Sequence, residues 1–361
     1  MKILFIVPYP SLGQSNRFRV EQYIPYLKKN GHQCYMRPFY DQKFYKILYK
    51  EGSYFKKTLF FIILSLRRLF DVVICHRFDI IFIHRETYPL GGAFFERTFK
   101  ILKKRIVYDF DDALFLPNIS ESNKFLSFFK NPDKIKSIIN LSDSVIAGNS
   151  YLQEFALRFN NNVKVLATAI DSHKYTPLHE RKKKQNVTIG WIGSVSTSIY
   201  LPALANVFKE IRVKYPHARF IAVGSGFGGL RFLEDCISFK EWSLENEIAD
   251  LQSFDVGIMP LIDNEWAKGK CAFKAIQYMS VGIPVVASRV GMNTEVIQDG
   301  VNGYLVDNQK EWIEKLSMLI ENTALRQAMG NAGRKTVEEK YAVEVNAKQF
   351  LRIIEDAYSK R

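Results

Sequence analysis

The stretch that decides the fold is residues 266–288, which read WAKGKCAFKAIQYMSVGIPVVAS. Lys268 and Lys270 precede an amphipathic run at 271–280, and a glycine and a proline follow that run. Glycine just past a helical run and proline soon after it are the usual signals that end a helix. We therefore expect a helix that begins close to two lysines and leads, after one turn, into the apolar strand 285–287.

The lysines of this stretch predict an anion site. The N-terminus of a helix carries unpaired N–H groups and a partial positive charge, so cations beside it attract phosphate. Lys270 and Lys274 lie four positions apart, a spacing that places two side chains on one face of a helix. The alternative is a solvated basic face, which the spacing alone indicates equally well.

Length and composition predict two domains in a reducing compartment. A chain of 361 residues exceeds the size at which a single core usually stops growing. The four cysteines are spread along the chain without a CxxC motif or clustered histidines, which argues against a zinc site or a disulfide framework. Residues 1–8 read as a strand rather than a signal peptide, and the apolar run 59–66 is too short to span a membrane.

The net charge of +14 indicates an anionic partner, which could be nucleic acid, a membrane surface or a phosphorylated substrate. Residues 43–68 carry seven lysines and arginines against a single acid, and aromatic residues interleave with them. This composition is typical of a helix that lies on an anionic bilayer, although a domain helix with a solvated basic back explains it too. No nucleic-acid motif accompanies the segment, so we expect no nucleic-acid partner.

The first half of the chain follows the rhythm of a doubly wound α/β sheet. The first expected elements are a strand at 2–7, a loop at 8–19, a helix at 20–29 and a strand at 33–37. Gly13, Arg17 and Arg19 fall in the loop after the first strand, where such sheets bind ligands. An exposed arginine loop is the alternative explanation for these residues.

Charged residues follow two further predicted strands of the first half. Arg85 comes directly after the strand 80–84. The sequence past the strand 105–107 supplies three carboxylates, Asp109, Asp111 and Asp112. Carboxylates past the end of a parallel strand point into the ligand crevice of such a sheet. They could form a metal site or a hydroxyl-binding site, or cap the helix that follows.

Residues 169–186 lose the periodicity and end in a run of charges, as is typical of a linker. The rhythm then restarts, with strands expected at 187–192, 220–223, 255–259, 285–287 and 303–306, and helices at 201–214, 316–321 and 341–360. We therefore expect a first domain at 1–168, the linker at 169–186, a second domain at 187–340 and a C-terminal helix at 341–361.

Several motifs of the second half occur in the order typical of a known family. They are WIGS at 191–194, DVGIMP at 255–260, the stretch 270–288, the segment from Gly291 to Glu295, and DGVNGYLV at 299–306. In this order they resemble the retaining glycosyltransferases of family 4, and residues 2–8 and 30–32 extend the likeness into the first half. The resemblance implies the GT-B fold, an α/β fold of two Rossmann-like lobes with an interlobe cleft and a C-terminal helix that packs back on the first lobe.

The resemblance also implies transfer of a sugar from a UDP- or GDP-sugar to an acceptor hydroxyl, with retention of the anomeric configuration. No metal or other cofactor is expected, because basic side chains and helix N-termini hold the diphosphate. Lys270 and Lys274 are predicted to stabilise the charge that develops on the leaving diphosphate. The departing phosphate then takes the acceptor's proton, and Asp111 is the candidate catalytic carboxylate.

The candidate donor-binding residues are Gly13, Arg17, Gly193, Ser194, Trp242, Lys268, Lys270, Lys274, Gln277 and Glu295. The candidate acceptor-side residues are Arg85, Asp109, Asp111 and Asp112. Trp242 could stack beside the nucleotide base or be an ordinary buried aromatic. Glu295 could hold backbone near the phosphates or cap a helix. His84 is expected to pack or to hydrogen-bond at the end of its strand.

The sequence departs from the family pattern at the glutamate pair. The two glutamates that the family carries eight positions apart fall on Gly269 and Gln277. Gln277 can still hydrogen-bond ribose hydroxyls, but without charge. Gly269 has no side chain to contact the sugar, so Asp263, Glu265 and Lys268 are the candidates for sugar recognition.

Two further family motifs are replaced. Residues 194–196 stand in place of the basic residue that usually follows the first strand of the second lobe, and Arg17, Arg19 or Lys268 are candidates for its role. The histidine motif of the first lobe is replaced by residues 109–112.

These features predict a hexosyltransferase-type enzyme of polysaccharide biosynthesis that acts on a lipid-linked or surface glycan. It would be cytoplasmic and peripheral at the inner face of the cell membrane. One alternative is a non-catalytic nucleotide-sugar-binding protein, which would explain the missing glutamates. The other is a metal-dependent transferase that would use Asp109, Asp111 and Asp112 as its metal site.

Overall fold

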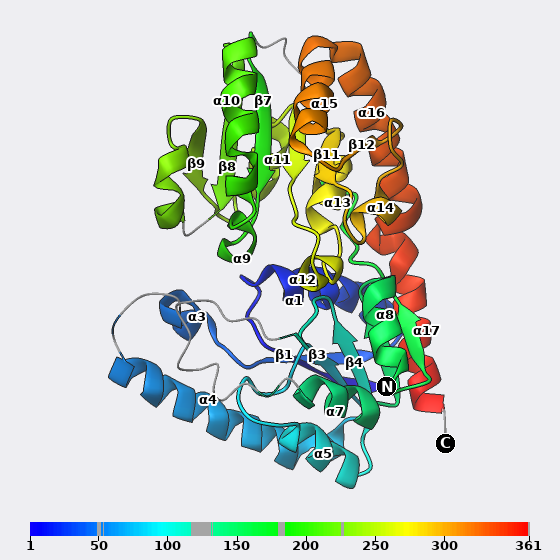
Figure 1. Cartoon of the computed structure of the whole chain (residues 1–361). Coiled ribbons are helices and arrows are strands. Elements are labelled where there is room, and N and C mark those ends of the chain that lie inside the picture. The colour runs from blue at the N-terminus through cyan, green and yellow to red at the C-terminus, as the bar shows by residue number, and fades with distance from the viewer. Residues whose placement is uncertain are drawn as a thin grey trace. The chain divides into compact units, whose positions relative to one another are not determined.

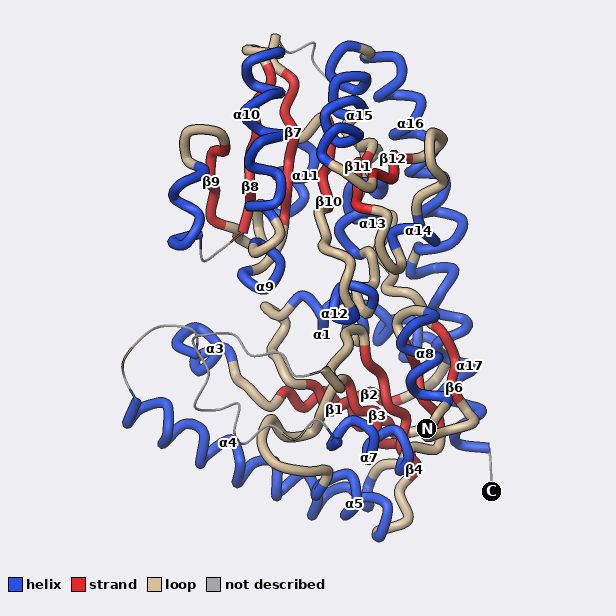
Figure 2. The backbone as a smooth tube through the Cα atoms, viewed as in Figure 1, coloured by secondary structure: helices blue, strands red, loops and turns tan. Residues whose placement is uncertain are grey.

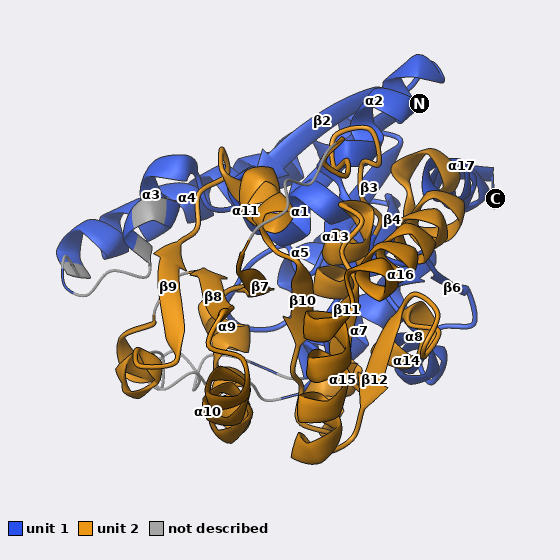
Figure 3. Ribbon diagram, turned by 90° about the horizontal axis from the view of Figure 1, so that it is seen from above, with its two compact units in different colours: residues 1–168, 346–361 blue, residues 169–345 orange. Residues whose placement is uncertain are grey.

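The computed structural model divides the chain into two compact units, which Figure 3 colours separately. The first unit is Met1–Thr168 with Asn346–Arg361, and the second is Ala169–Val345. The structure describes residues 1–48, 52, 54–116, 131, 133–179, 185–224 and 227–359. Parts of the predicted membrane segment (49–51 and 53) and of the predicted linker (180–184) lie outside these residues.

A parallel sheet of six strands in the order β2-β1-β3-β4-β5-β6 forms the centre of the first unit. Its strands are β1 (Lys2–Val7), β2 (Gln33–Pro38), β3 (Ile80–His84), β4 (Arg105–Phe110), β5 (Ser144–Ala147) and β6 (Val163–Val165). The strands β1 and β3 are nearly continuous apolar runs because helices cover both of their faces. Sequence reasoning missed β6, since three residues at a sheet edge are too short for a periodicity to show.

Helices cover this sheet, with α1 on one side and α4 and α5 on the other (Figure 2). They are α1 (Gln14–Arg19), α2 (Ile24–Lys29), α3 (Gln42–Leu48), α4 (Tyr54–Ile74), α5 (Phe94–Ile101), α7 (Asp133–Leu141) and α8 (Ser150–Leu157). The loop predicted at 8–19 is wrong in its second half, because α1 occupies it. No helix in the described part of the chain is long and apolar enough to cross a membrane.

The C-terminal helix α17 (Val343–Ser359) returns to the first unit, as predicted (Figure 1). The ring of Phe350 stacks on Tyr23 with 4.4 Å between centroids and lies 5.3 Å from the ring of Phe82 in β3. All three rings are buried. Aromatic burial therefore ties the last helix to the sheet formed by the start of the chain.

The second unit repeats the plan, with strand order β12-β11-β10-β7-β8-β9. Its strands are β7 (Val187–Ile192), β8 (Ala218–Gly224), β9 (Ile237–Glu241), β10 (Val256–Met259), β11 (Val285–Ser288) and β12 (Gly303–Val306). Its main helices are α10 (Ala205–Lys214), α11 (Glu247–Ser253), α13 (Phe273–Ser280), α15 (Gln309–Glu321) and α16 (Thr323–Thr336). The sequence prediction missed the edge strand β9 and the helix α16, and it began α15 too late.

The stretch 266–288 supplies the helix and strand that organise this second sheet. Tyr278 of α13 accepts a hydrogen bond from the backbone N–H of Ile192 in β7 (3.0 Å) and donates one to the carbonyl of Ile258 in β10 (3.2 Å). A Cβ on Gly257 would lie 2.4 Å from the Tyr278 ring, so only glycine leaves room for the helix to approach β10. Burial raises the pKa of Tyr278, which keeps the hydroxyl protonated as a donor.

Gly190 allows an equally close contact in the centre of the same sheet. A Cβ at this position would lie 2.1 Å from the ring of Phe254. Gly190→Ala should therefore lower the free energy of unfolding by about 1–3 kcal/mol through overpacking, measured by chemical denaturation. Gly228→Ala is the matched control, since nothing lies within 4 Å of a Cβ there. Equal stability of the two variants would contradict the packing.

Candidate functional site

Polar groups and one lysine meet at the carboxyl edge of the second sheet. Gly193 follows β7, and a Cβ there would lie 2.5 Å from the ring of Trp191 and 2.7 Å from Cε of Lys274. A Cβ on Gly224, at the end of β8, would lie 2.4 Å from the carbonyl oxygen of Gly193. Trp242, just past β9, donates its backbone N–H to the carbonyl of Gly224 (2.9 Å). The structure thus brings together three of the predicted donor-binding residues: Gly193, Trp242 and Lys274.

This edge coincides with the topological switch point of the sheet. The first strand of this sheet is β7. The chain adds β8 and β9 on one side of β7 and then crosses over to place β10 on its other side. Ligands of open α/β sheets bind outside the carboxyl ends of the strands where the order reverses. Gly193 and Lys274 lie at that point, and their contact leaves a compact, side-chain-free backbone turn beside a cation.

Lys274 is fixed in the first turn of α13. Its ammonium lies 5.7 Å from the centroid of the Trp191 ring, a cation–π distance. The residue before the helix, Ala272, has a left-handed φ of 48°, and no side-chain hydrogen bond caps the helix. The first N–H groups of α13 and the ammonium of Lys274 together present positive charge at the switch point.

Lys270 lies outside the helix, in the four-residue connection (269–272) between the short helix α12 (Glu265–Lys268) and α13. The left-handed backbone at Ala272 interrupts the helix between Lys270 and Lys274. The prediction that these lysines share one helix face is therefore wrong. Lys270 instead places its ammonium 4.8 Å from the centroid of the Trp266 ring.

Lys268 ends α12 and forms ion pairs with Glu265 (2.9 Å) and Asp263 (3.9 Å), so the three candidates for sugar recognition lie together. These pairs raise the pKa of Lys268, chiefly through the hydrogen bond with Glu265. Gly291 packs against this helix end, because a Cβ there would lie 3.0 Å from Cα of Lys268. Lys268 therefore borders the loop that follows β11.

Gln277 and Glu295 differ sharply in exposure. The side chain of Gln277 lies one turn after Lys274 and is buried, with no partner in the structure for its Nε2. Glu295 is exposed on α14 (Asn293–Val296). Burial of Tyr341 raises the pKa of that residue to about 12, and the nearby charge of Glu295 adds to the shift. Gln277 is thus a buried donor beside the switch point, whereas Glu295 lies on the surface.

Side chains around Trp242 fix its ring. The indole Nε1 donates to Oε2 of Glu247 (2.9 Å), and the same buried carboxylate accepts a hydrogen bond from the hydroxyl of Tyr175. Ser194 is exposed and caps the four-residue helix α9 (Val195–Ser198), with its hydroxyl 2.9 Å from that of Ser196.

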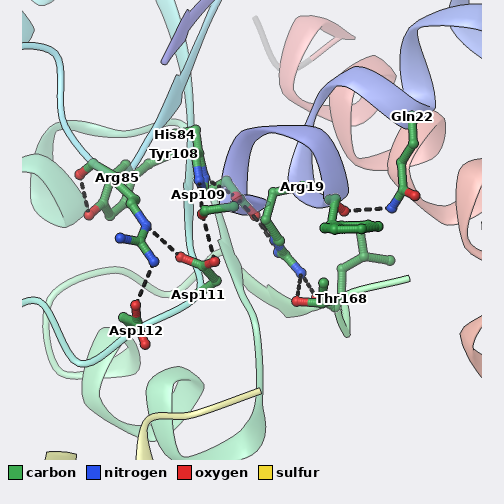
Figure 4. Close-up of polar contacts among 12 residues, drawn as sticks. Arg19, Gln22, His84, Arg85, Tyr108, Asp109, Asp111, Asp112 and Thr168 are labelled. Atoms are coloured by element: carbon green, nitrogen blue, oxygen red, sulfur yellow. Dashed lines mark hydrogen bonds and ion pairs between the residues drawn. The ribbon is translucent and has the colours of Figure 1, made fainter. Parts of the chain in front are cut away.

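A second polar cluster occupies the carboxyl edge of the first sheet (Figure 4). His84 at the end of β3 places Nδ1 2.6 Å from Oδ2 of Asp109, and Arg19 of α1 binds both oxygens of that carboxylate. All three side chains are buried. Asp109 lies within β4 rather than past its end, which corrects the sequence prediction, whereas His84 hydrogen-bonds at its strand end as expected.

Ser15 extends this cluster and was not found from the sequence. Its hydroxyl donates to Oδ2 of Asp111 (2.7 Å) and lies 2.6 Å from Nε2 of His84. The Ser15 hydroxyl therefore links Asp111 of the loop after β4 to His84 at the end of β3. The only sequence signal for this role was the position of Ser15 in the segment after the first strand.

Arg85 holds the other two carboxylates. Its Nε donates to Asp111 (2.7 Å) and its terminal nitrogen to Asp112 (2.5 Å). The backbone of Arg85 is left-handed, with φ of 63°, and its N–H donates to the carbonyl of Asp109 (2.7 Å). Burial would raise the pKa of Asp111, but Arg85 and His84 outweigh it and hold that pKa well below the usual range.

The cluster also lies at a switch point, since β2 and β3 flank β1 on opposite sides. Ser15 follows β1 and His84 ends β3, so these two residues come from the two neighbouring strands at the switch point. The carboxylates face arginines and a histidine rather than one another. Among the described residues no group of three or more His, Cys, Asp or Glu is arranged to hold a metal ion.

The predicted donor residues of the first unit lie at and just before α1. Gly13 precedes α1, and a Cβ there would lie 2.5 Å from Cβ of Tyr9. Arg17 lies on α1 with its guanidinium 4.9 Å from the centroid of the Phe18 ring. Arg19 is only 1% exposed and bound to Asp109, so it is tied to the fold of the first unit.

Comparison with known proteins agrees with this architecture. The chain is 25% identical over 303 residues to an uncharacterized glycosyltransferase of Methanocaldococcus jannaschii, covering 77% of this chain and 75% of that protein. It is 22% identical over 194 residues to the capsular polysaccharide biosynthesis glycosyltransferase CapM of Staphylococcus aureus, covering 52% and 50%.

The structure of Anabaena HepE, solved in complex with UDP and glucose, superposes with a TM-score of 0.71 at 17% identity and covers 99% of this chain and 100% of its own. The fold is GT-B. Residues 186–322 match the family model of glycosyl transferases group 1. The matched segment contains the switch point of the second sheet, and together the comparisons support a glycosyltransferase.

The buried charges of the first unit make stability depend on pH. Burial alone would raise the pKa of Asp109. The guanidinium of Arg19 and the hydrogen bond with His84 outweigh burial, so the pKa of Asp109 is lowered. A carboxylate with a lowered pKa stabilises the fold above its unfolded pKa of about 3.9, and this contribution is lost as pH falls through the folded pKa.

Asp109→Asn should therefore lower the free energy of unfolding by about 3–5 kcal/mol near neutral pH, because it leaves Arg19 buried without its counterion. The difference in free energy of unfolding between wild type and variant should shrink once the pH falls below about 4. Urea unfolding at a series of pH values measures this difference. Asp133→Asn, at an exposed ion pair, is the control and should change stability by less than about 1 kcal/mol. A gap that stays constant with pH would contradict the assignment.

Proposed function

We propose that the protein transfers a sugar from a UDP- or GDP-sugar to an acceptor hydroxyl. The observation that carries this proposal is the contact between Lys274 and the Gly193 turn at the switch point of the second sheet. A nucleoside diphosphate needs backbone that it can approach closely and positive charge beside it. The Gly193 turn supplies the backbone, and Lys274 with the positive end of the α13 dipole supplies the charge. The family match over 186–322 and the name of the HepE complex support a nucleotide-sugar as the ligand.

The chemistry follows from the charge on the leaving group. As the glycosidic bond to the diphosphate breaks, negative charge builds on the phosphate oxygens, and Lys274 with the N–H groups of α13 stabilises it. Lys270 lies near enough in sequence to add a second cation. Because these groups neutralise the diphosphate, we propose that the reaction needs no metal.

On the acceptor side, Asp111 is already occupied. Both of its oxygens accept hydrogen bonds, from Arg85 and from Ser15, and its pKa is low. A carboxylate of this kind orients a hydroxyl better than it removes a proton. This favours a mechanism with retention in which an oxygen of the departing phosphate takes the proton of the acceptor.

We further propose that the acceptor is a lipid-linked or surface glycan and that the protein works in the cytoplasm at the inner face of the membrane. The similarity to a capsular polysaccharide biosynthesis enzyme supports the glycan. The cationic segment 43–68 supports an anionic membrane as partner.

A second candidate function is non-catalytic binding of a nucleotide-sugar. Gly269 and the buried Gln277 stand where the family carries glutamates, and neither offers a charged side chain to the sugar. This candidate shares the diphosphate site and differs only in the absence of turnover.

Binding tests the site directly. UDP- and GDP-sugars should raise the melting temperature of the wild type in a thermal-shift panel, because a ligand that binds only the folded state stabilises it. Lys274→Ala should abolish most of that shift and lower the transfer rate on the same sugar by roughly 10²-fold. Lys209→Ala, which removes an exposed lysine of α10, is the control and should behave like the wild type.

The same assay separates the alternatives. Transfer that persists in EDTA and yields product with the anomeric configuration of the donor agrees with the proposal. Binding without turnover on any donor and glycan acceptor would favour the non-catalytic candidate. A thermal shift in Lys274→Ala equal to that of the wild type would contradict a diphosphate site at Lys274.

A further inference from the structure

The helix α4 exposes an unusually apolar face. Eight of its large apolar side chains are about half exposed or more: Phe55 85%, Leu59 50%, Ile62 51%, Ile63 52%, Leu66 60%, Leu69 47%, Phe70 54% and Val73 67%. Six of them, from Phe55 to Val73, follow one another at alternating intervals of four and three. This spacing places them in one stripe along the helix, which Ile63 and Phe70 widen.

The opposite face of the same helix buries charge. Arg68 and Asp71 are each 1% exposed and form an ion pair of 2.7 Å, and Arg37 of β2 donates to the same carboxylate (2.6 Å). Burial lowers the pKa of Arg68 to about 10, and Asp71 opposes that shift. A helix that turns its ions inward and its leucines outward is inverted for a protein surface in contact with water.

This arrangement differs from the one that composition predicts for residues 43–68. Three of the aromatic residues, Phe44, Phe60 and Phe61, pack with Phe39 and Tyr88 in a small core, whereas Phe55 is exposed. Arg68 is buried as well. The exposed face of α4 is mainly aliphatic, with Phe55 and Phe70 as its aromatic members, and it runs beyond residue 68 to Val73 near the end of the helix.

The neighbouring helix α5 continues the apolar surface. It contacts α4, and both helices lie on the same side of the first sheet (Figure 1). Phe94 and Ile101 of α5 are 63% and 78% exposed, and Leu102, just after it, is 47% exposed. We call the exposed apolar residues of α4 and α5, with Leu102, the α4–α5 face. So many exposed apolar side chains on two neighbouring helices usually mark an interaction site.

The charges around the α4–α5 face select its partner. The helices α3, α4 and α5 contain two acids, Asp71 and Glu96, and both are buried. Lys43, Lys56 and Arg97 are exposed on the same helices. Two copies of the chain pairing through this face would bring cations together without an exposed carboxylate from these helices to oppose them. An anionic lipid surface offers both hydrocarbon for the stripe and negative charge for the rim.

We propose that the α4–α5 face inserts into the surface of an anionic bilayer, with α4 lying in the plane of the membrane. The apolar stripe enters the boundary between headgroups and acyl chains, and Lys43, Lys56 and Arg97 contact lipid phosphates. The contact is therefore mainly hydrophobic rather than an adsorption of the basic segment. It deepens the proposed membrane partner but depends only on the first unit, so it stands or falls separately from the diphosphate site.

Vesicle sedimentation tests this insertion. The wild-type chain should sediment with vesicles of phosphatidylcholine containing roughly a third phosphatidylglycerol, and should remain largely bound at about 0.5 M salt, where charges are screened beyond a few Å. The double variant Ile63→Glu/Leu66→Glu should lose at least about tenfold in partitioning, since it places charge in the apolar stripe. Both positions are exposed, so the fold should be retained, with melting temperature as the check.

Val213→Glu is the matched control. It adds an acid at an apolar residue of α10 that is 84% exposed and should leave sedimentation unchanged. Absence of vesicle binding by the wild type, complete release at high salt, or wild-type binding by the double variant would each overturn the proposal. A wild-type dimer in light scattering that the double variant converts to a monomer, without vesicle binding, would assign the face to a second copy instead.

Discussion

The hydroxyl of Tyr278 holds the second unit in the form on which the candidate site depends. It accepts from Ile192 in β7 and donates to Ile258 in β10, so one side chain of α13 bridges the two strands that flank the switch point. A buried hydroxyl with both bonds satisfied positions a helix more strictly than apolar packing does. With α13 fixed, Lys274 in its first turn has to lie against Gly193 at the end of β7.

The two sheets use their switch points differently. In the first unit this edge is occupied by the protein's own charges, because Arg19 and Arg85 form ion pairs with the three aspartates. In the second unit the described residues at the switch point are lysine, glycine backbone and an uncapped helix start. This contrast supports the proposal that the anionic donor binds to the second unit and a neutral, hydroxyl-bearing acceptor to the first.

Much of this architecture could be predicted from the sequence because it depends on local patterns. The continuous apolar strands and the Gly–Pro signal after α13 indicated the two sheets. The sequence also grouped Gly193 and Lys274 as candidate donor-binding residues, and the structure brings these two residues together. The left-handed residue Ala272 was not predictable, since alanine carries no signal for that backbone, and it separates Lys270 from the helix. Ser15 and the pairing of Arg19 with Asp109 join residues far apart in sequence, so no local pattern shows them. The outward apolar face of α4 has the same periodicity as an inward one, and only the fold shows which side is covered.

We propose that the switch point between β7 and β10 holds a nucleoside diphosphate through Lys274. A crystal structure of the protein with bound UDP or GDP tests it most directly. We expect a phosphate oxygen within about 3 Å of the Lys274 ammonium, and we expect the diphosphate to lie against the backbone of Gly193. A nucleotide bound elsewhere, with Lys274 still stacked on Trp191, would contradict it.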